Sequence, residues 1–259
     1  MNTPFILETS GLSKEFKGFS AVRGVDLRVR RGHIHALIGP NGAGKTTCFN
    51  LLTKFLSPTA GEIRFNGQDI TGLSSSKIAR LGIVRSFQIS AIFPNLTVLE
   101  NVQMALQQRA GLTLQFWKRL RVLDRLQDRA NELLTQVGLE AFARELAGSL
   151  PYGRKRALEI ATTLAMDPEL MLLDEPTQGM GREDVQMITQ LIKRAASSRT
   201  VLMVEHNLGV VSRLADRITV LQRGEVLAEG SYGEVSQDER VRTAYMGGGS
   251  MTREGSHVH

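Results

Sequence analysis

The chain has 259 residues, a hydrophobic fraction of 42% and a net charge of +6. This composition is sufficient for a sizeable core, and no apolar run approaches the roughly 18 residues that a membrane-spanning helix needs. The one cysteine, Cys48, excludes an internal disulfide and fits a reducing compartment, and no secretory signal is visible at the N-terminus. Basic residues are spread along the chain and aromatic residues make up only 5%, so we expect no nucleic-acid partner.

Two strands are predicted near the start of the chain, and the second has the apolar and polar alternation of a half-exposed antiparallel strand. Residues 5–9 and 25–29 are the predicted strands. The segment between them contains Phe16, an aromatic side chain that can either stack on a nucleotide base or pack in the core or in a turn. The residues alone leave both interpretations open.

The next segment is a glycine-rich loop between a predicted strand at 34–38 and a predicted helix at 46–54. It fits the phosphate-loop pattern G-x-x-x-x-G-K-[ST] with the run Gly39-Pro40-Asn41-Gly42-Ala43-Gly44-Lys45-Thr46. Backbone N–H groups of such a loop point at phosphate oxygens, and the helix N-terminus adds the positive end of its dipole. Lys45 is expected to reach the β- and γ-phosphates and Thr46 to ligate Mg²⁺. We expect nucleotide contacts throughout this run and from Thr47.

The middle of the chain is predominantly helical. From about residue 97 to 138 apolar residues recur every three or four positions, and a further helix is predicted at 153–166. Part of this stretch has a basic face, formed by Lys118, Arg119, Arg121, Arg125 and Arg129. Such a face is either a solvated surface or a contact for lipid headgroups or a partner.

The remaining predicted elements alternate between strands and helices, which indicates an α/β fold. Strands are predicted at 62–67, 83–88, 169–174, 200–204, 217–221 and 225–229, and helices at 76–81, 183–196 and 207–214. We therefore expect a P-loop NTPase core with a mixed sheet and an antiparallel β-subdomain, over residues 1–88 and 163–246. A helical subdomain at 89–162 would interrupt the core, and the tail 247–259 is expected to lack fixed structure.

Two carboxylates end the apolar strand predicted at 169–174. Asp174 is expected to lie beside the phosphate loop and hold Mg²⁺, directly or through water. Glu175 follows where the chain leaves the sheet, and it is a candidate general base that polarises the attacking water. Together with the phosphate loop, these residues predict hydrolysis of a bound nucleoside triphosphate.

Five motifs follow one another along the chain: the phosphate loop, Gln88, the run Leu150-Pro151-Tyr152-Gly153-Arg154, the run Leu172-Leu173-Asp174-Glu175-Pro176, and His206. In this order they resemble the ATP-binding subunits of ABC transporters, over about residues 5–246. The resemblance implies that Phe16 stacks on adenine, Gln88 senses Mg²⁺ and the γ-phosphate, and His206 contacts the γ-phosphate. It implies ATP and Mg²⁺ as cofactors, Glu175, His206, Gln88 and Lys45 as catalytic residues, and Thr46, Gln88 and Asp174 as metal ligands.

Further runs narrow the resemblance to the branched-chain amino acid uptake type of this family: residues 93–102, 150–154, 204–207 and 244–247. This type implies a second ATPase subunit, in a heterodimer or a homodimer, a membrane permease and a periplasmic solute-binding protein. It would place the chain at the cytoplasmic face of the inner membrane as a peripheral subunit. Similar systems also carry amides, urea or other small polar solutes, so the solute stays open.

The chain departs from the family pattern in two places. Where the usual signature reads Leu-Ser-Gly-Gly-Gln, Pro151 replaces the serine, Tyr152 a glycine and Arg154 the glutamine. Proline has neither a hydroxyl nor an N–H for a phosphate, whereas Gly153 keeps the close backbone approach. The segment 178–181 lacks the aspartate that usually follows the catalytic glutamate. Both departures concern the half-site that the signature would build with a partner.

Two other functions compete with transport. A soluble ABC-type ATPase acting on nucleic acid or ribosomes usually has two cassettes or a long coiled-coil insertion, and this chain has one cassette and an insertion of ordinary size. A phosphate-loop kinase or nucleotide switch would leave Gln88, His206 and the 150–154 motif unexplained.

Overall fold

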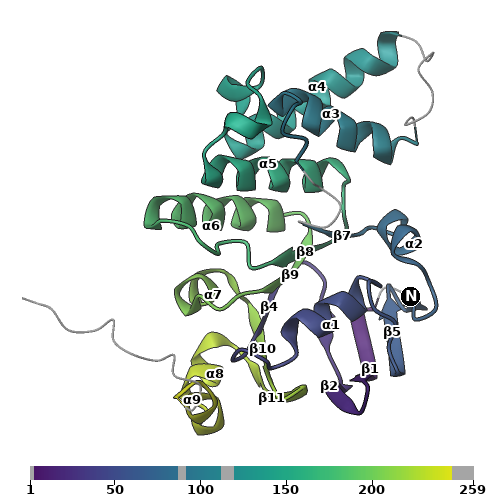
Figure 1. The fold of residues 1–259 in the computed structure, drawn as a ribbon, viewed down its shortest axis with the longest axis vertical. Helices are drawn as coiled ribbons and strands as arrows, with labels where there is room; N and C mark the ends of the chain where they lie inside the picture. Colours follow the sequence, from purple (N-terminus) through teal and green to yellow (C-terminus); the bar gives the residue numbers. More distant parts are fainter. Residues whose placement is uncertain (1–2, 87–91, 112–119, 247–259) are drawn as a thin grey trace, which may run out of the picture. The chain divides into compact units, whose positions relative to one another are not determined.

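The computed structural model describes residues 3–86, 92–111 and 120–246. The chain forms two compact units (Figure 1). The first unit contains residues 1–72 and 204–259, and the second contains residues 73–203. Because the second unit is inserted into the first, the first is built from both ends of the chain.

An antiparallel sheet forms one part of the first unit. Its order is β2-β1-β5-β6, and β3 pairs with β1 outside this path. The strands are β1 Phe5–Phe16, β2 Phe19–Val25, β3 Arg28–Arg30, β5 Ala60–Phe65 and β6 Gln68–Asp69. An Asn-Gly turn joins β5 to β6, with positive φ at Asn66 and Gly67, as a tight hairpin turn requires. The expected antiparallel β-subdomain is therefore present.

The continuous strand predicted at 25–29 was wrong, because β2 ends at Val25 and β3 begins at Arg28. The Thr9 side chain causes the interruption. Its Oγ1 accepts from the Leu27 N–H at 2.9 Å and donates to the Val25 carbonyl at 2.8 Å. A side chain thus replaces the strand partner at these two backbone groups.

A mixed arrangement of strands forms the other part of the first unit. Strand β4 (Ile34–Ile38) pairs in parallel with β10 (Arg217–Gln222), and β10 pairs antiparallel with β11 (Glu225–Gly230). The accompanying helices are α1 Lys45–Leu52, α7 Leu208–Leu214, α8 Tyr232–Gln237 and α9 Glu239–Met246. The sequence analysis did not predict α8 and α9. A capping box between Ser231 and Glu234 begins α8.

The second unit contains strands β9-β8-β7 in that order. They are β7 Ile83–Arg85, β8 Leu170–Asp174 and β9 Thr200–Val204, and β7 pairs in parallel with β8. Four of the five β8 residues and all residues of β9 are buried, as the continuous apolar runs predicted. Two helices of this unit lie close to their predicted positions: α2 Ser75–Arg80 and α6 Arg182–Ala196.

Helices also form the rest of the second unit: α3 Val98–Arg109, α4 Leu120–Val137 and α5 Tyr152–Ala165. A capping box between Thr97 and Glu100 begins α3. The predicted apolar stripes form the buried faces, for example Val102 and Leu106 on α3 and Leu133 on α4. Part of the predicted basic face, including Lys118 and Arg119, lies outside the described residues. Within the described ranges, no helix is both long enough and apolar enough to cross a bilayer.

Candidate functional site

The phosphate loop joins β4 to α1 in the first unit (Figure 1). Every residue of β4 is buried, so the strand fixes the start of the loop in the core. Helix α1 begins at Lys45, and its N-cap Gly44 makes no side-chain capping hydrogen bond. The first turn of α1 therefore presents backbone N–H groups and the positive end of the helix dipole, which together favour an anion.

At two positions of the loop only glycine fits, because both the backbone conformation and the nearby atoms exclude a side chain. Gly39 has φ +152° and Gly44 has φ +99°. A Cβ at Gly39 would lie 2.2 Å from the Leu221 carbonyl oxygen, and one at Gly44 would lie 2.5 Å from the Ala21 carbonyl oxygen. Neither backbone neighbour can move aside cheaply, so the loop shape depends on these two positions.

The Lys45 side chain lies inside the loop. Its Nζ donates to the carbonyl oxygens of Gly39 at 2.7 Å and Pro40 at 3.0 Å, and the residue is only 8% exposed. The ammonium is thus positioned at the start of α1, where a phosphate oxygen can become a further acceptor. Thr46 is exposed beside it.

Residues from the far end of the chain support the loop. The Gly224 N–H donates to the Ala43 carbonyl at 3.0 Å, and the Gly224 carbonyl accepts from the Arg23 N–H at 2.8 Å. Backbone hydrogen bonds therefore join the turn between β10 and β11 to the loop and to β2.

Tyr245 of α9 also lies close to the loop. It is 6% exposed, and its hydroxyl has no hydrogen-bond partner among the described residues. Burial raises the pKa of Tyr245 to about 12, and the Gly39 backbone lowers this pKa to a smaller extent. We therefore regard Gly39 as a close neighbour of the hydroxyl and not as a well-formed hydrogen-bond partner.

Phe16 and His206 are both accessible in the first unit. The Phe16 ring, at the end of β1, is 41% exposed, with Lys14 Nζ 5.2 Å from its centroid. An exposed ring argues against the core alternative and leaves a face for stacking. His206 follows β9 on an exposed turn, which the buried Glu205 carboxylate fixes by accepting from the N–H groups of His206 at 2.9 Å and Asn207 at 3.0 Å.

Asp174 ends β8 in the second unit, and Arg85 at the end of β7 forms an ion pair with it. Arg85 is 4% exposed and Asp174 is 22% exposed, measured on the side chains. The contact joins Arg85 Nη2 to Asp174 Oδ2, so it holds one carboxylate oxygen and orients the other. The sequence analysis did not predict this partner, since no local motif includes an arginine far upstream in the chain.

Glu175 adopts a backbone conformation that is uncommon for glutamate. Its φ is +46°, and its carbonyl accepts from the Gln178 N–H at 3.1 Å. Non-glycine residues in this region are strained and are concentrated at functional sites. This turn fixes the direction in which the Glu175 side chain leaves the sheet.

The signature segment begins α5 in the second unit. Pro151 is the N-cap, and Gly153 is buried so closely against α6 that a Cβ would lie 2.3 Å from Asp184 Oδ1. The Tyr152 hydroxyl donates to the Gln178 carbonyl at 3.2 Å and accepts from Arg156 Nη2 at 2.9 Å. The two segments that depart from the family pattern are therefore in direct contact.

Arg154, the signature residue that replaces the usual glutamine, packs against an aromatic ring. Its guanidinium carbon lies 3.9 Å from the centroid of the Phe142 ring, a cation–π contact within the second unit. This contact gives the charged side chain a structural partner inside its own chain.

The predicted site residues thus fall in both units. The phosphate loop, Phe16 and His206 belong to the first unit, and Gly153, Asp174 and Glu175 belong to the second. Gln88 lies outside the described residues. A strand, glycine loop and helix, with a second buried strand that ends in Asp-Glu, define a phosphate-loop NTPase.

Comparisons with known proteins define the class further. The ABC transporter family model matches residues 22–178, and a model described as branched-chain amino acid ATP-binding cassette transporter matches residues 225–250. The chain is 39% identical to the high-affinity branched-chain amino acid transport ATP-binding protein BraF of Pseudomonas aeruginosa, over 93% of this chain and 98% of the relative. It is 38% identical to LivG of Escherichia coli, which has the same description, with the same coverage.

Solved structures give the same result for the fold. An ATP-binding cassette of an ABC transporter in its ADP conformation matches with a TM-score of 0.83 and 28% identity, over 95% of this chain and 100% of that chain. A dimeric cassette in a post-hydrolysis state with ADP and Pi matches with a TM-score of 0.73 and 27% identity, over 87% and 98%. The chain belongs to the ABC transporter family, and it is an ATP-binding cassette ATPase.

Proposed function

We propose that this chain is the ATPase subunit of an importer for branched-chain amino acids. The observation that carries the proposal is the match over nearly the whole chain to BraF and LivG, whose descriptions name high-affinity branched-chain amino acid transport. The match of residues 225–250 to the branched-chain type supports it independently of the catalytic motifs. The chain would act on a membrane permease, from the cytoplasmic face of the membrane.

We assign the following work to the chain's own residues. Lys45 and the N–H groups of the loop bind the β- and γ-phosphates, and Phe16 stacks on the base. Glu175 accepts a proton from the attacking water, and His206 and Gln88 contact the γ-phosphate side of the site.

The donors of the site fit a hard cation. The hydroxyl of Thr46, the amide oxygen of Gln88 and the carboxylate of Asp174 are oxygen ligands of the kind that Mg²⁺ prefers. Arg85 contacts Asp174 at Oδ2, and in this proposal Oδ1 faces the ion or a water bound to it. Bound Mg²⁺ would neutralise charge on the β- and γ-phosphates.

We further propose that two cassettes act together. A related cassette with ADP and Pi is dimeric. The signature segment 150–154 of this chain would face nucleotide held by a second ATPase subunit, in a heterodimer or a homodimer. ATP stabilises the closed dimer because it makes contacts there that the open state lacks, and closure would drive the permease.

Reconstitution tests the proposal. The chain is assembled in vesicles with its permease and solute-binding protein, and ATP-dependent uptake of leucine, isoleucine and valine is measured against urea and short amides. We expect uptake of the branched-chain amino acids only, and abolition by Lys45→Ala. Uptake of urea or amides alone would assign the second candidate solute class.

The catalytic assignment has its own test. Glu175→Gln should bind ATP normally and hydrolyse it at least about a hundredfold more slowly in the assembled complex. Undiminished turnover would remove Glu175 from the role of base. An unchanged nucleotide dissociation constant in Lys45→Ala would contradict the assignment of the loop lysine.

A further inference from the structure

A cavity of about 420 Å³ opens in the second unit, outside every residue assigned to ATP. It lies among α4, α5, α6 and the segment that joins α6 to β9, and its size is in the range of small-molecule sites. Its lining includes Arg129, Thr135, Arg194, Ser197, Ser198 and Arg199, together with apolar residues of the three helices. No carboxylate is among these residues.

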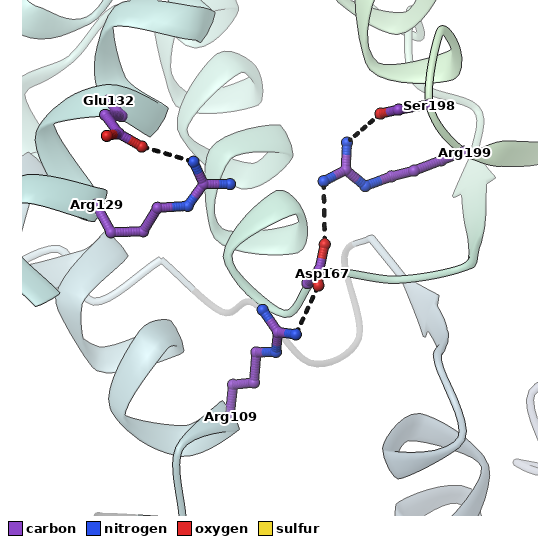
Figure 2. Close-up of polar contacts among 6 residues, drawn as sticks. All are labelled: Arg109, Arg129, Glu132, Asp167, Ser198 and Arg199. Atoms are coloured by element: carbon purple, nitrogen blue, oxygen red, sulfur yellow. Dashed lines mark hydrogen bonds and ion pairs between the residues drawn. The ribbon is translucent and has the colours of Figure 1, made fainter.

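The charge of the lining is positive and comes from three separate segments. Arg129 belongs to α4, Arg194 to the last turn of α6, and Arg199 to the segment that follows α6. In Figure 2 the Arg129 and Arg199 side chains extend toward each other from opposite sides of the view. Convergence from three segments is typical of a binding site and not of a single solvated helix face.

Carboxylates nearby offset only part of this charge. Arg129 Nη1 lies 2.7 Å from Glu132 Oε2, and Arg199 Nη2 lies 3.3 Å from Asp167 Oδ1. Asp167 is shared, because its Oδ2 lies 2.6 Å from Arg109 Nη2 (Figure 2). Arg194 has no ion pair with any residue in the described ranges. The region therefore keeps an excess of positive charge.

Arg199 is the most constrained of the three arginines. Its side chain is 14% exposed, and it is held by Asp167 through Nη2 and by Ser198 Oγ, 3.1 Å from Nη1. Its Nε is buried and has no acceptor among the described residues. A ligand in the cavity would therefore meet the guanidinium through the part of the side chain that remains exposed, and the buried Nε–H is a reporter of that contact.

We propose that this cavity binds a small phosphorylated metabolite, about the size of a phosphorylated triose or pentose. Guanidinium N–H groups are the donors that phosphate oxygens accept from, and the Ser198 hydroxyl, which accepts from Arg199, can donate as well. The Thr135 and Ser197 hydroxyls donate to backbone carbonyls of their own helices and turns. A zwitterionic amino acid fits less well, because the lining offers no carboxylate for its ammonium group. The apolar lining residues are almost fully buried and expose little surface, so the ligand is predominantly polar.

The test uses the full-length chain with Lys45→Ala, so that the phosphate loop does not take up the probe. Glycerol 3-phosphate and ribose 5-phosphate are titrated by calorimetry and by ¹H–¹⁵N spectra of the arginine Nε–H groups. We expect saturable binding with a dissociation constant of about 1 mM or tighter, and a shift of the Arg199 Nε–H signal. That signal is identified by its loss in Arg199→Lys.

A matched pair of variants on α6 separates a site from general attraction to positive charge. Arg194→Gln should weaken binding at least about tenfold, since one charge-assisted contact is lost. Lys193→Gln removes the same charge at the neighbouring exposed position, which is not in the lining, and should leave the affinity unchanged. Both positions are exposed, so neither change is expected to affect folding.

The proposal would be overturned if binding were not saturable, or if Arg194→Gln and Lys193→Gln weakened it equally. It would also be overturned if citrate bound as tightly as the two phosphorylated probes, or if a single-stranded oligonucleotide bound more tightly than both probes. The citrate result would indicate a general anion site. The oligonucleotide result would indicate a nucleic-acid surface.

Discussion

Arg85 and Asp174 form an ion pair at the ends of two adjacent parallel strands, β7 and β8. The strand register places Arg85 opposite Leu172, so the arginine reaches forward to the carboxylate that ends β8. A ligand carboxylate that is oriented by a second residue is common at metal sites, and loss of such a partner usually weakens metal binding or activity.

The first prediction concerns this pair. Arg85→Ala should lower the ATPase rate of the assembled complex by at least about tenfold, because Asp174 loses its orienting partner. It should also lower the free energy of unfolding by about 1–3 kcal/mol, since a half-buried carboxylate is left without its partner. The rate and urea denaturation check both effects. Arg80→Ala, at an exposed position in the same unit, is the control and should change neither.

The second prediction concerns space in the phosphate loop. Gly44→Ala should abolish measurable nucleotide binding, because the new Cβ would lie 2.5 Å from the Ala21 carbonyl oxygen. Gly42→Ala is the matched control: its φ is also positive, +78°, but nothing lies within 4 Å of the new Cβ. We expect Gly42→Ala to cost only about 1 kcal/mol of conformational strain. If both variants lost nucleotide affinity equally, the positive φ, and not the contact with the Ala21 carbonyl, would be the cause of the loss.

Local motifs and non-local contacts differ in how far the sequence could predict them. The phosphate loop is a contiguous run whose shape depends on glycines and a helix start, so its position followed from the residues directly. The Arg85–Asp174 pair depends on strand register, which single-sequence patterns do not give. Short α8 and α9 lack enough turns for a periodic signal, although Ser231 and Glu234 have the spacing of a capping box. The break before Arg28 depends on two hydrogen bonds of the Thr9 side chain, which no local pattern predicts.

The third prediction is a pH dependence that comes from β4. His35 is 1% exposed, and its Nε2 lies 2.8 Å from Thr219 Oγ1, which donates to Glu229 at 2.9 Å. Burial, the largest effect, lowers the pKa of His35 to about 4, while Glu229 acts in the opposite direction. The unfolded chain, with the ordinary pKa of 6.5, therefore binds the proton first as the pH falls.

Stability from His35 should thus be complete above pH 6.5 and decrease as the pH falls from 6.5 toward 4, by a total of about 3 kcal/mol. The midpoint of urea denaturation as a function of pH measures this decrease. His35→Gln should flatten the profile in this window even if the variant is less stable overall. His33→Gln, at the half-buried neighbouring histidine, should keep the steep profile. A steep profile in His35→Gln would assign the effect to other groups.

The fourth prediction concerns the divergent signature. Tyr152→Phe keeps the ring but removes the hydroxyl that joins Gln178 and Arg156. ATP turnover in the assembled complex should fall about fivefold, the equivalent of one hydrogen bond of roughly 1 kcal/mol. The nucleotide affinity of the isolated chain should not change, because its own phosphate loop is untouched. Tyr232→Phe on α8 is the control, and a loss of affinity in Tyr152→Phe would mean that the effect is not confined to the signature.

The contacts of Gly39, Ala43 and Gly44 with Leu221, Gly224 and Tyr245 have a consequence for synthesis of the chain. The ribosome delivers the phosphate loop before the second unit, but the residues that shape the loop are made only after the whole second unit. A nascent chain that ends before β10 contains the entire motif and lacks its support. Because β10, β11 and α9 complete the fold around the loop, we expect tight nucleotide binding to appear only after almost the whole chain has been made.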